Sequence, residues 1–370
     1  TGWALPAEGG TLTATAVLKD AAGNTTPEAT DTAVLDTTAP NNNQTLGLTI
    51  DADANNDGFI NAAEKTGATT TLTATFDGSK AAVGDKITFT VAGVTDTVTL
   101  TQAMIDVGTA TSNRAGAGWT IPADGSTMTA TAVLTDAAGN STPVKTDTAI
   151  VDTTNFDDFT NLDIVIKTDD DNNKLIGQPE LDATSGKINV EVTLPVNAKA
   201  GDVLLITGTG NSPQSITLTG AQISAGSVLV NFNAPANGTN FVATAKVTDA
   251  AGNTSAVVSD DAVINTQAAG APTVTITEDS NNDGYINATE LLGTIEVNIK
   301  PPAGAAVGDT LIVTKPDGST QTLTITTSAE LTNGITISYT APGADGLLTF
   351  SAVHKTAAGN TSAAGSDSAT

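Results

Sequence analysis

The stretch Thr127-Met-Thr-Ala-Thr-Ala-Val-Leu-Thr-Asp-Ala-Ala-Gly-Asn-Ser141 contains one strand and the turn that ends it. Small and β-branched residues fill its first half, and polar and apolar side chains alternate along 127–132. A period of two places one set of side chains inward and is typical of a half-buried β-strand. Asp136-Ala-Ala-Gly-Asn140 then predicts a tight hairpin turn, in which glycine or asparagine adopts a positive φ.

This strand-and-turn pattern is repeated along the chain. The turn at Asp20-Ala-Ala-Gly-Asn24 returns at 136–140, at 249–253 and, with threonine in place of aspartate, at 356–360. A fixed spacing of about 110 residues is the mark of a tandem array. The array, rather than the total length, therefore sets the number of domains.

The repeat phase predicts four pieces. We expect residues 1–36 to be the C-terminal tail of a truncated repeat, and residues 37–153 and 154–266 to be whole repeats. Residues 267–370 form a further repeat whose final strand is incomplete. We call these last three pieces the first, second and third repeats. The chain is interpreted as a window on a longer array.

Short apolar and threonine-rich runs, separated by Gly, Asp, Asn and Pro, fill each repeat. In the first repeat these runs are 45–50, 69–76, 86–91, 95–100, 127–134 and 146–151. Six or seven short strands in about 110 residues are typical of an immunoglobulin-like sandwich. No amphipathic segment long enough for a helix is evident. The predicted fold class is therefore all-β, a tandem array of immunoglobulin-like β-sandwiches.

A twelve-residue acidic loop is inserted in each sandwich, at 53–64, 169–180 and 279–290. Oxygen-bearing side chains at positions 1, 3 and 5, a carbonyl at 7, a direct or water-bridged ligand at 9 and glutamate at 12 form the EF-hand-like calcium pattern. The predicted ligands are Asp53, Asn55, Asp57, Phe59, Asn61 and Glu64 in the first loop, Asp169, Asp171, Asn173, Leu175 and Glu180 in the middle loop, and Asp279, Asn281, Asp283, Tyr285, Asn287 and Glu290 in the last. The alternative is that these segments are ordinary polar turns.

The surroundings of the loops exclude a helix–loop–helix EF-hand, because a predicted strand precedes each loop. Position 8 is isoleucine in all three loops, which predicts an apolar side chain that ties the loop to the core. The middle loop differs, with Lys174 at position 6, where the other two have glycine, and Gly177 at position 9. A lysine in a left-handed conformation is strained, and its charge opposes a cation. We therefore expect weaker calcium binding there, or none.

Further carboxylates gather at the ends of the repeats. The turn residues Asp20, Asp136 and Asp249 and the linker residues Asp36 and Asp152 are candidates for additional calcium ligands at the domain junctions. Thr356 replaces the turn aspartate in the last copy. The sequence leaves open whether these aspartates only shape the turn or also bind a cation.

Composition narrows the function classes. The chain has 40 acidic and 14 basic residues, for a net charge of −26, so it attracts cations and repels nucleic acid. It has no cysteine and one histidine, and no nucleophile–base arrangement is discernible, so we do not expect an enzyme. No apolar run is long enough to insert this segment into a membrane.

The turn Asp20-Ala-Ala-Gly-Asn24-Thr25 with its copies, the linker Asp36-Thr-Thr-Ala-Pro40 and the acidic loops resemble the bacterial immunoglobulin-like repeats of large, calcium-dependent biofilm-associated and RTX-type surface adhesins. The resemblance implies an extracellular location on the bacterial cell surface after type I secretion, with folding driven by external calcium. It also implies a role as an extender that supports cell adhesion and biofilm formation.

These observations together predict a calcium-stiffened spacer whose partners are calcium and the neighbouring repeats of the same chain. One alternative is a self-assembling extracellular fibre or surface layer, in which other copies of the chain are partners. Another is a glycan- or ice-binding module, although aromatic residues are only 3 % of the chain and stacking platforms for sugars are therefore scarce.

Overall fold

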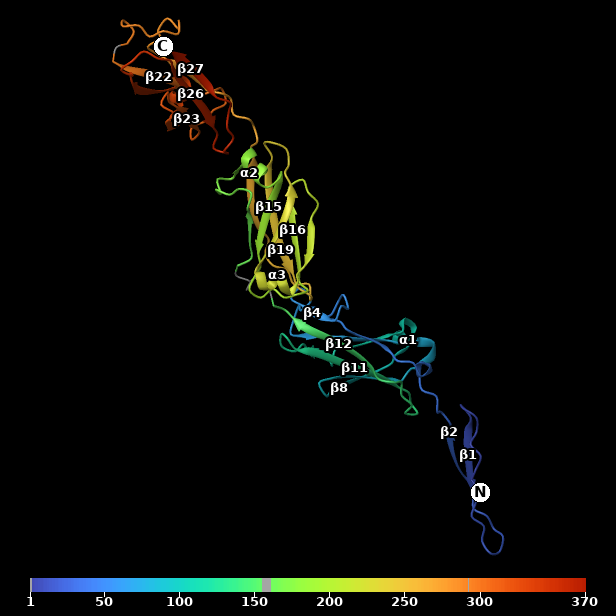
Figure 1. The fold of residues 1–370 in the computed structure, drawn as a ribbon. Coiled ribbons are helices and arrows are strands. Elements are labelled where there is room, and N and C mark those ends of the chain that lie inside the picture. The colour runs from blue at the N-terminus through green and yellow to red at the C-terminus, as the bar shows by residue number, and fades with distance from the viewer. Residues whose placement is uncertain (1, 155–160, 292) are drawn as a thin grey trace. The chain divides into compact units, whose positions relative to one another are not determined.

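A computed structural model describes residues 2–154, 161–291 and 293–370. It divides into two compact units, one formed by residues 1–158 with 250–254 and the other by residues 159–249 with 255–370. Nearly all the regular structure is β-strand (Figure 1). The predicted boundary at residue 154 is followed by residues 155–160, which lie outside the described part of the chain, as does Thr1.

The first repeat is built from two main sheets. One has the strand order β4 (Phe59–Asn61), β12 (Lys145–Asp152), β11 (Thr127–Thr135), β7 (Lys86–Val91) and β8 (Val94–Thr99). The other contains β3 (Gly47–Ile50), β6 (Leu72–Thr75) and β9 (Thr109–Ser112), and β5 (Thr69–Thr70) pairs with β10 (Trp119–Thr120). Alternate side chains of both sheets fill the core, among them Leu72, Phe89, Trp119 and Met128. This is the two-layer sandwich that the alternation predicts.

The same plan recurs in the second compact unit. The second repeat pairs β13 (Asp163–Ile166), β15 (Lys187–Thr193) and β18 (Ser227–Asn233), and opposite them β14 (Leu175–Ile176), β20 (Val258–Ile264), β19 (Asn240–Thr248), β16 (Val203–Gly208) and β17 (Gln214–Thr217). The third pairs β21 (Thr273–Ile276), β22 (Thr294–Lys300) and β25 (Ile335–Thr340), and also β24 (Thr320–Thr324), β23 (Thr310–Thr314), β26 (Leu348–Lys355) and β27 (Gly365–Ala369). Residues 11–34 form one hairpin, β1 (Thr11–Ala16) with β2 (Ala29–Val34).

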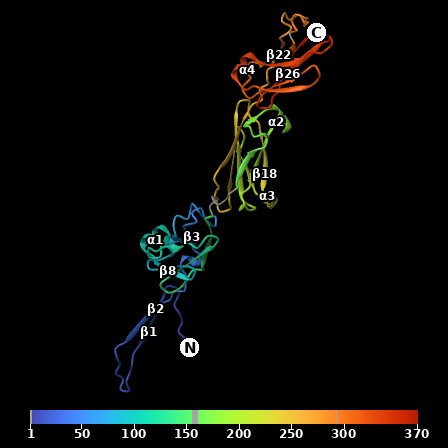
Figure 2. The ribbon, with the colours of Figure 1, turned by 90° about the vertical axis from the view of Figure 1, so that its left-hand side faces the viewer.

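The prediction of an all-β fold is confirmed, but the expectation of no helix was wrong. Four six-residue helices are present in the described residues: α1 (Gln102–Val107), α2 (Gln178–Ala183), α3 (Gly220–Ala225) and α4 (Ser328–Asn333). The side chains of Thr101, Thr219 and Thr327 cap α1, α3 and α4. Figure 2 shows α2 and α3 at opposite ends of the second repeat. No helix in the described residues has the length and apolarity needed to cross a bilayer.

Each acidic loop is joined to the sheet by residues that sequence reasoning treated as loop alone. In the first repeat, positions 7 to 9 form β4, which pairs in parallel with the last strand, β12. In the second repeat, β14 pairs with β20 in the same way. The position-8 side chains of Ile60 and Ile176 are fully buried, and Ile286 is partly buried against the third core. The loop is thus tied to the sandwich by backbone pairing and by one apolar side chain.

A second recurrent contact holds the ends of the N-terminal piece, the first repeat and the second repeat. The carboxylate of Glu8 accepts hydrogen bonds from the backbone and hydroxyls of Thr37 and Thr38. Asp124 does the same for Thr153, and Asn237 for Thr266. Hydrogen bonding to its charged form lowers the pKa of Glu8 to about 2. These contacts fix the chain direction as it leaves the last strand.

We expect Ile60→Ala to lower the free energy of unfolding of the first repeat by about 2–5 kcal/mol, because a buried side chain is removed and leaves a cavity. Urea denaturation followed by Trp119 fluorescence measures this repeat, since the chain's other tryptophan, Trp3, is exposed. Val94→Ala, at an exposed position in β8, is the control and should shift stability by less than about 0.5 kcal/mol. Equal effects from the two variants would contradict the anchoring role of position 8.

Candidate metal sites

The three acidic loops share one hydrogen-bonded frame. The position-1 carboxylate accepts the N–H groups of positions 5 and 6: Asp53 from Asp57 and Gly58, both at 3.0 Å. The corresponding distances at Asp169 are 3.0 and 3.0 Å, and at Asp279 they are 3.0 and 2.9 Å. The middle loop, whose sequence departs from the pattern, has the same position-1 hydrogen bonds as the other two. The frame therefore tolerates the substitutions that the sequence analysis counted against it.

Position 6 shows how the middle loop keeps this backbone. Lys174 adopts φ +67°, close to the +88° of Gly58 and the +84° of Gly284. A side chain in this left-handed region is strained. Its ammonium group forms an ion pair with Asp260 of β20, with an Nζ–Oδ1 distance of 2.5 Å. The charge expected to oppose a cation is therefore held by a carboxylate outside the loop.

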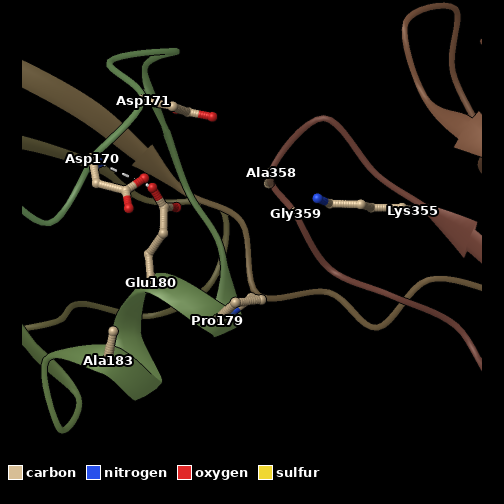
Figure 3. A pocket seen from close by; sticks show the side chains of 8 residues that line it. All are labelled: Asp170, Asp171, Pro179, Glu180, Ala183, Lys355, Ala358 and Gly359. Atoms are coloured by element: carbon tan, nitrogen blue, oxygen red, sulfur yellow. Dashed lines mark hydrogen bonds between the residues drawn. The ribbon is translucent and has the colours of Figure 1, made fainter.

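The ligand set converges most clearly in this middle loop. One oxygen each of Asp169, Asp171 and Glu180 lie within 4.8 Å of one another. Glu180 closes the loop from α2, accepting the N–H of Asp170 at 3.2 Å (Figure 3). It also accepts the N–H of Gly177 at 2.7 Å. Carboxylate oxygens at this separation fit Ca²⁺, which takes six to eight oxygen ligands in flexible geometry. The donor set and its spacing are thus compatible with calcium.

The electrostatics of the first and middle loops favour a cation. Burial raises the pKa of Asp53, and repulsion from Asp57 and Glu64 adds to this effect despite the opposing backbone hydrogen bonds. Burial likewise raises the pKa of Asp169 and of Glu180, with a contribution from the nearby carboxylate of Asp171. Each buried carboxylate is therefore less easily ionised in the folded loop than in the unfolded chain. A bound cation would remove that penalty.

Loop positions 7 and 9 also have structural roles, in starting a strand and in capping the turn that leaves the loop. Phe59 and Leu175 begin β4 and β14, and Tyr285 is exposed. The Oδ1 of Asn61 caps the exit turn, accepting the N–H groups of Ala63 at 2.9 Å and Glu64 at 3.1 Å. Asn287 does the same for Thr289. The asparagine oxygen at position 9 thus has a structural function in the residues described.

The junction aspartates are first of all turn residues. Asp20 accepts the N–H groups of Ala22 and Asn24 and the side-chain amide of Asn24. Asp136 accepts the N–H groups of Gly139 and Asn140 and the side-chain amide of Asn140. The turn interpretation of the motif accounts for these contacts. Asp152 ends β12, and Asp249 follows β19.

Sequence reasoning missed one carboxylate at the first junction. Asp85 is buried and lines a pocket together with Asp36 and Asp136. Burial raises its pKa, and repulsion from Asp136 and Asp36 raises it further, against the hydrogen bond from Ala82. The sequence signal was a Gly84-Asp85 step before a strand, which on its own indicates only a turn.

In the third repeat, the buried aspartate that corresponds to Asp85 has different hydrogen-bond partners. This aspartate, Asp309, accepts the N–H groups of Ala306 and Ala357, both at 2.9 Å. His354, which stands where the first repeat has Leu134, is buried, and its Nε2 lies 2.9 Å from Asp309 Oδ2. The single histidine is therefore a partner of a buried carboxylate, and the turn beside it carries Thr356 instead of an acid.

Comparison with known proteins agrees with this architecture. Residues 48–153 and 212–266 match the sequence model of the bacterial Ig-like domain. These two stretches, which make up less than half of the chain, are therefore similar to bacterial Ig-like domains. This confirms the predicted resemblance to bacterial Ig-like repeats, and it places the acidic loop at 53–64 inside the first matched domain. No curated protein matches this chain.

Three solved structures are similar over most of their length to this chain. One is of a 1.5-MDa bacterial ice-binding adhesin, with 25 % identity, coverage of 88 % of this chain and 96 % of that chain, and a TM-score of 0.37. The second is of a Ca²⁺-stabilized adhesin that helps an Antarctic bacterium bind ice, with 25 % identity, 97 % and 81 % coverage and a TM-score of 0.34. The third is a tetra-tandem repeat from the extending region of a large adhesion protein, with 21 % identity, 98 % and 82 % coverage and a TM-score of 0.31. At these TM-scores the likenesses assign no ligand to this chain.

The raised pKa of Asp53 predicts an inverted pH dependence in the absence of divalent cations. The folded-state pKa of Asp53 lies above its unfolded value, so ionisation of this carboxyl group disfavours the folded state. Stability is therefore lost as the pH rises through the range between these two pKa values, and it is regained as the pH falls. With chelator present, wild type should therefore gain stability relative to Asp53→Asn between pH 7 and about pH 4. Urea unfolding followed by Trp119 fluorescence measures the difference. Parallel pH profiles for the two proteins would refute this electrostatic account.

Proposed function

We propose that this chain is an extender segment of a bacterial surface adhesin, in which calcium folds and stiffens a tandem array of Ig-like domains. The observation that carries the proposal is the shared frame of the three acidic loops, each inside its own sandwich and tied to that sandwich's sheet or core. We propose a location outside the cell, where calcium is abundant. The tandem arrangement supports the extender role, because repeats that contact mainly their neighbours suit a long spacer.

Calcium would be held by the side-chain oxygens of positions 1, 3, 5 and 12 and by the position-7 carbonyl. In the middle loop these are Asp169, Asp171, Asn173 and Glu180 with Leu175. We propose that all three loops bind calcium, the middle one included, because Lys174 is paired with Asp260 and the three carboxylates already converge. A metal ion there supplies only charge and coordination, so no catalysis is proposed.

The energetic effect is large enough to matter. A ligand present at 100 times its Kd stabilises the folded state by about 2.7 kcal/mol per site. Domains of this size have a total stability of about 5–15 kcal/mol. Since the apo loops also bury carboxylates with raised pKa values, removing calcium both withdraws that stabilisation and leaves the repulsion. Calcium is therefore expected to decide how rigid each repeat is.

We propose a further cation at the first junction, between Asp36, Asp85 and Asp136. These three carboxylates line one pocket and repel one another there. A cation bound by them would connect the linker at residue 36 to the body of the first repeat. In the third repeat, Asp309 is instead satisfied by N–H donors and His354, and no cation is proposed there.

Substituting the position-12 glutamate tests the loops one at a time. We expect Glu64→Gln, Glu180→Gln and Glu290→Gln each to bind one calcium ion fewer than wild type, because position 12 supplies the bidentate carboxylate. Native mass spectrometry of the full chain counts the ions, and Glu28→Gln, at an exposed position outside the loops, is the control. An unchanged count in all three loop variants would mean that the loops are ordinary polar turns.

The spacer role predicts a calcium-dependent change in small-angle X-ray scattering of this chain. In excess calcium the profile should be that of an extended, rigid particle. With chelator it should become that of a flexible or partly unfolded chain, because the loops and the first junction lose their cation. A rigid profile that is identical in both conditions would remove calcium control from the proposal.

A further inference from the structure

The turn of the third repeat lies directly against the acidic loop of the second, within the second compact unit (Figure 3). The Asn173 side-chain amide donates to the carbonyl of Ala357 at 3.1 Å. The N–H of Gln178, at loop position 10, donates to Asn360 Oδ1 at 2.7 Å, and Asn360 Nδ2 donates to the linker carbonyl of Asn265 at 2.6 Å. Asn360 is buried, and both the oxygen and the nitrogen of its amide group take part in joining the loop, the linker and the turn.

The first compact unit shows the same arrangement with different residues. The turn at Ala250–Thr254 belongs to this unit. Its Asn253 Oδ1 accepts the N–H of Ala62, again loop position 10, at 2.9 Å, and Asn253 Nδ2 donates to the carbonyl of Asp152 at 2.9 Å. Asn61, at position 9, donates to the carbonyl of Ala251 at 2.9 Å. Two turns of different sequence context therefore contact two loops through equivalent atoms.

Gly177 has a clear role in this contact. A Cβ built on Gly177 would lie 1.7 Å from the carbonyl oxygen of Ala358 and 3.3 Å from Asn360 Oδ1. Its own φ is −85°, which any residue adopts, so glycine is required there by the approaching turn and not by the loop backbone. The glycine that departs from the asparagine of the other two loops at position 9 is thus a packing requirement of the contact.

The third loop also has asparagine at position 9, but among the described residues no turn is docked against it. There Asn287 is exposed and its side-chain amide donates to Glu290 Oε2 at 2.6 Å, beside the N–H of Asn287 at 3.1 Å. In the first loop Asn61 is buried and its amide donates to Ala251 instead. The docked turn therefore draws the position-9 amide away from the glutamate carboxylate that a calcium ion would need.

We propose that the Ala-Ala-Gly-Asn turn of each repeat is a docking element that recognises the folded loop of the preceding repeat, so that docking and calcium binding strengthen each other. The inference rests on the proposed calcium binding. The position-12 glutamate holds the N–H of position 9 while the turn asparagine holds the N–H of position 10, so both act on one backbone segment. A ligand that fixes this segment favours the other by the same factor. Calcium occupancy in one repeat thereby controls its connection to the next.

The test uses the full chain and two substitutions on opposite sides of the contact. Gly177→Ala introduces the clashing methyl group, and Asn360→Ala removes the bonds to Gln178 and Asn265. Gly220→Ala is the matched control for the first, since a Cβ there meets nothing within 4 Å. Asn24→Ala is the control for the second, since Asn24 occupies the same turn position and is exposed.

Calcium titration followed by ¹H–¹⁵N NMR resolves the loops, because the position-6 amides of Gly58, Lys174 and Gly284 each donate to the position-1 carboxylate of their own loop. We expect the calcium midpoint at Lys174 to rise about fivefold or more in Gly177→Ala and Asn360→Ala, within the usual range of coupling between two sites. The Gly284 midpoint, and all midpoints in the two controls, should match wild type.

The outcomes separate this inference from the proposed function. Calcium-responsive amides with an unchanged Lys174 midpoint in both docking variants would overturn the coupling and leave calcium binding intact. If none of the three amides responds to calcium in wild type, the calcium function and the coupling fail together. A midpoint that rises equally at Lys174 and Gly284 would also overturn the proposal, because Gly177→Ala and Asn360→Ala disturb docking on the middle loop alone.

Discussion

The carboxylate at position 1 of each acidic loop determines the geometry on which the rest of the site depends. Asp53, Asp169 and Asp279 each accept the two N–H groups that turn the loop back on itself, and each lies buried at the edge of the sandwich. The same group is also the first predicted calcium ligand. The position-1 carboxylate therefore both orders the loop backbone and serves as a predicted cation ligand. It is buried next to other negatively charged groups.

This double use explains why the middle loop keeps its shape without glycine at position 6. Two hydrogen bonds to Asp169 hold the N–H groups of Asn173 and Lys174 in place, and Asp260 holds the lysine ammonium group. Together these contacts offset the strain of a left-handed lysine, which is of the order of 1 kcal/mol. A substitution that weakens a motif as a sequence pattern can thus leave its geometry intact when neighbouring strands supply the compensation.

Much of the fold was predictable because the determining signals are local. Alternation along 127–132 and the turn at Asp136-Ala-Ala-Gly-Asn140 led to β11 and to the turn hydrogen bonds at Asp136. The strands β4 and β14 were missed because two or three residues become a strand only through parallel pairing with a strand far along the chain. Asp85 was missed for the same reason, since its neighbours Asp36 and Asp136 are distant in sequence. The capping boxes at Thr219 and Thr327 were local and could have revealed α3 and α4.

The two ways of satisfying a buried aspartate suggest that the junctions of this array differ in chemistry while they share a backbone plan. At the first junction, Asp85 has one N–H donor and faces two carboxylates, an arrangement that a divalent cation completes. In the third repeat, Asp309 has two N–H donors and a histidine, and Thr356 removes the neighbouring negative charge. The turn asparagine makes the same linker contact in both, from Asn140 to Asp36 and from Asn360 to Asn265. Since the linker contact is common and the charge around it is not, the array can vary the calcium dependence of individual junctions without altering how its repeats connect.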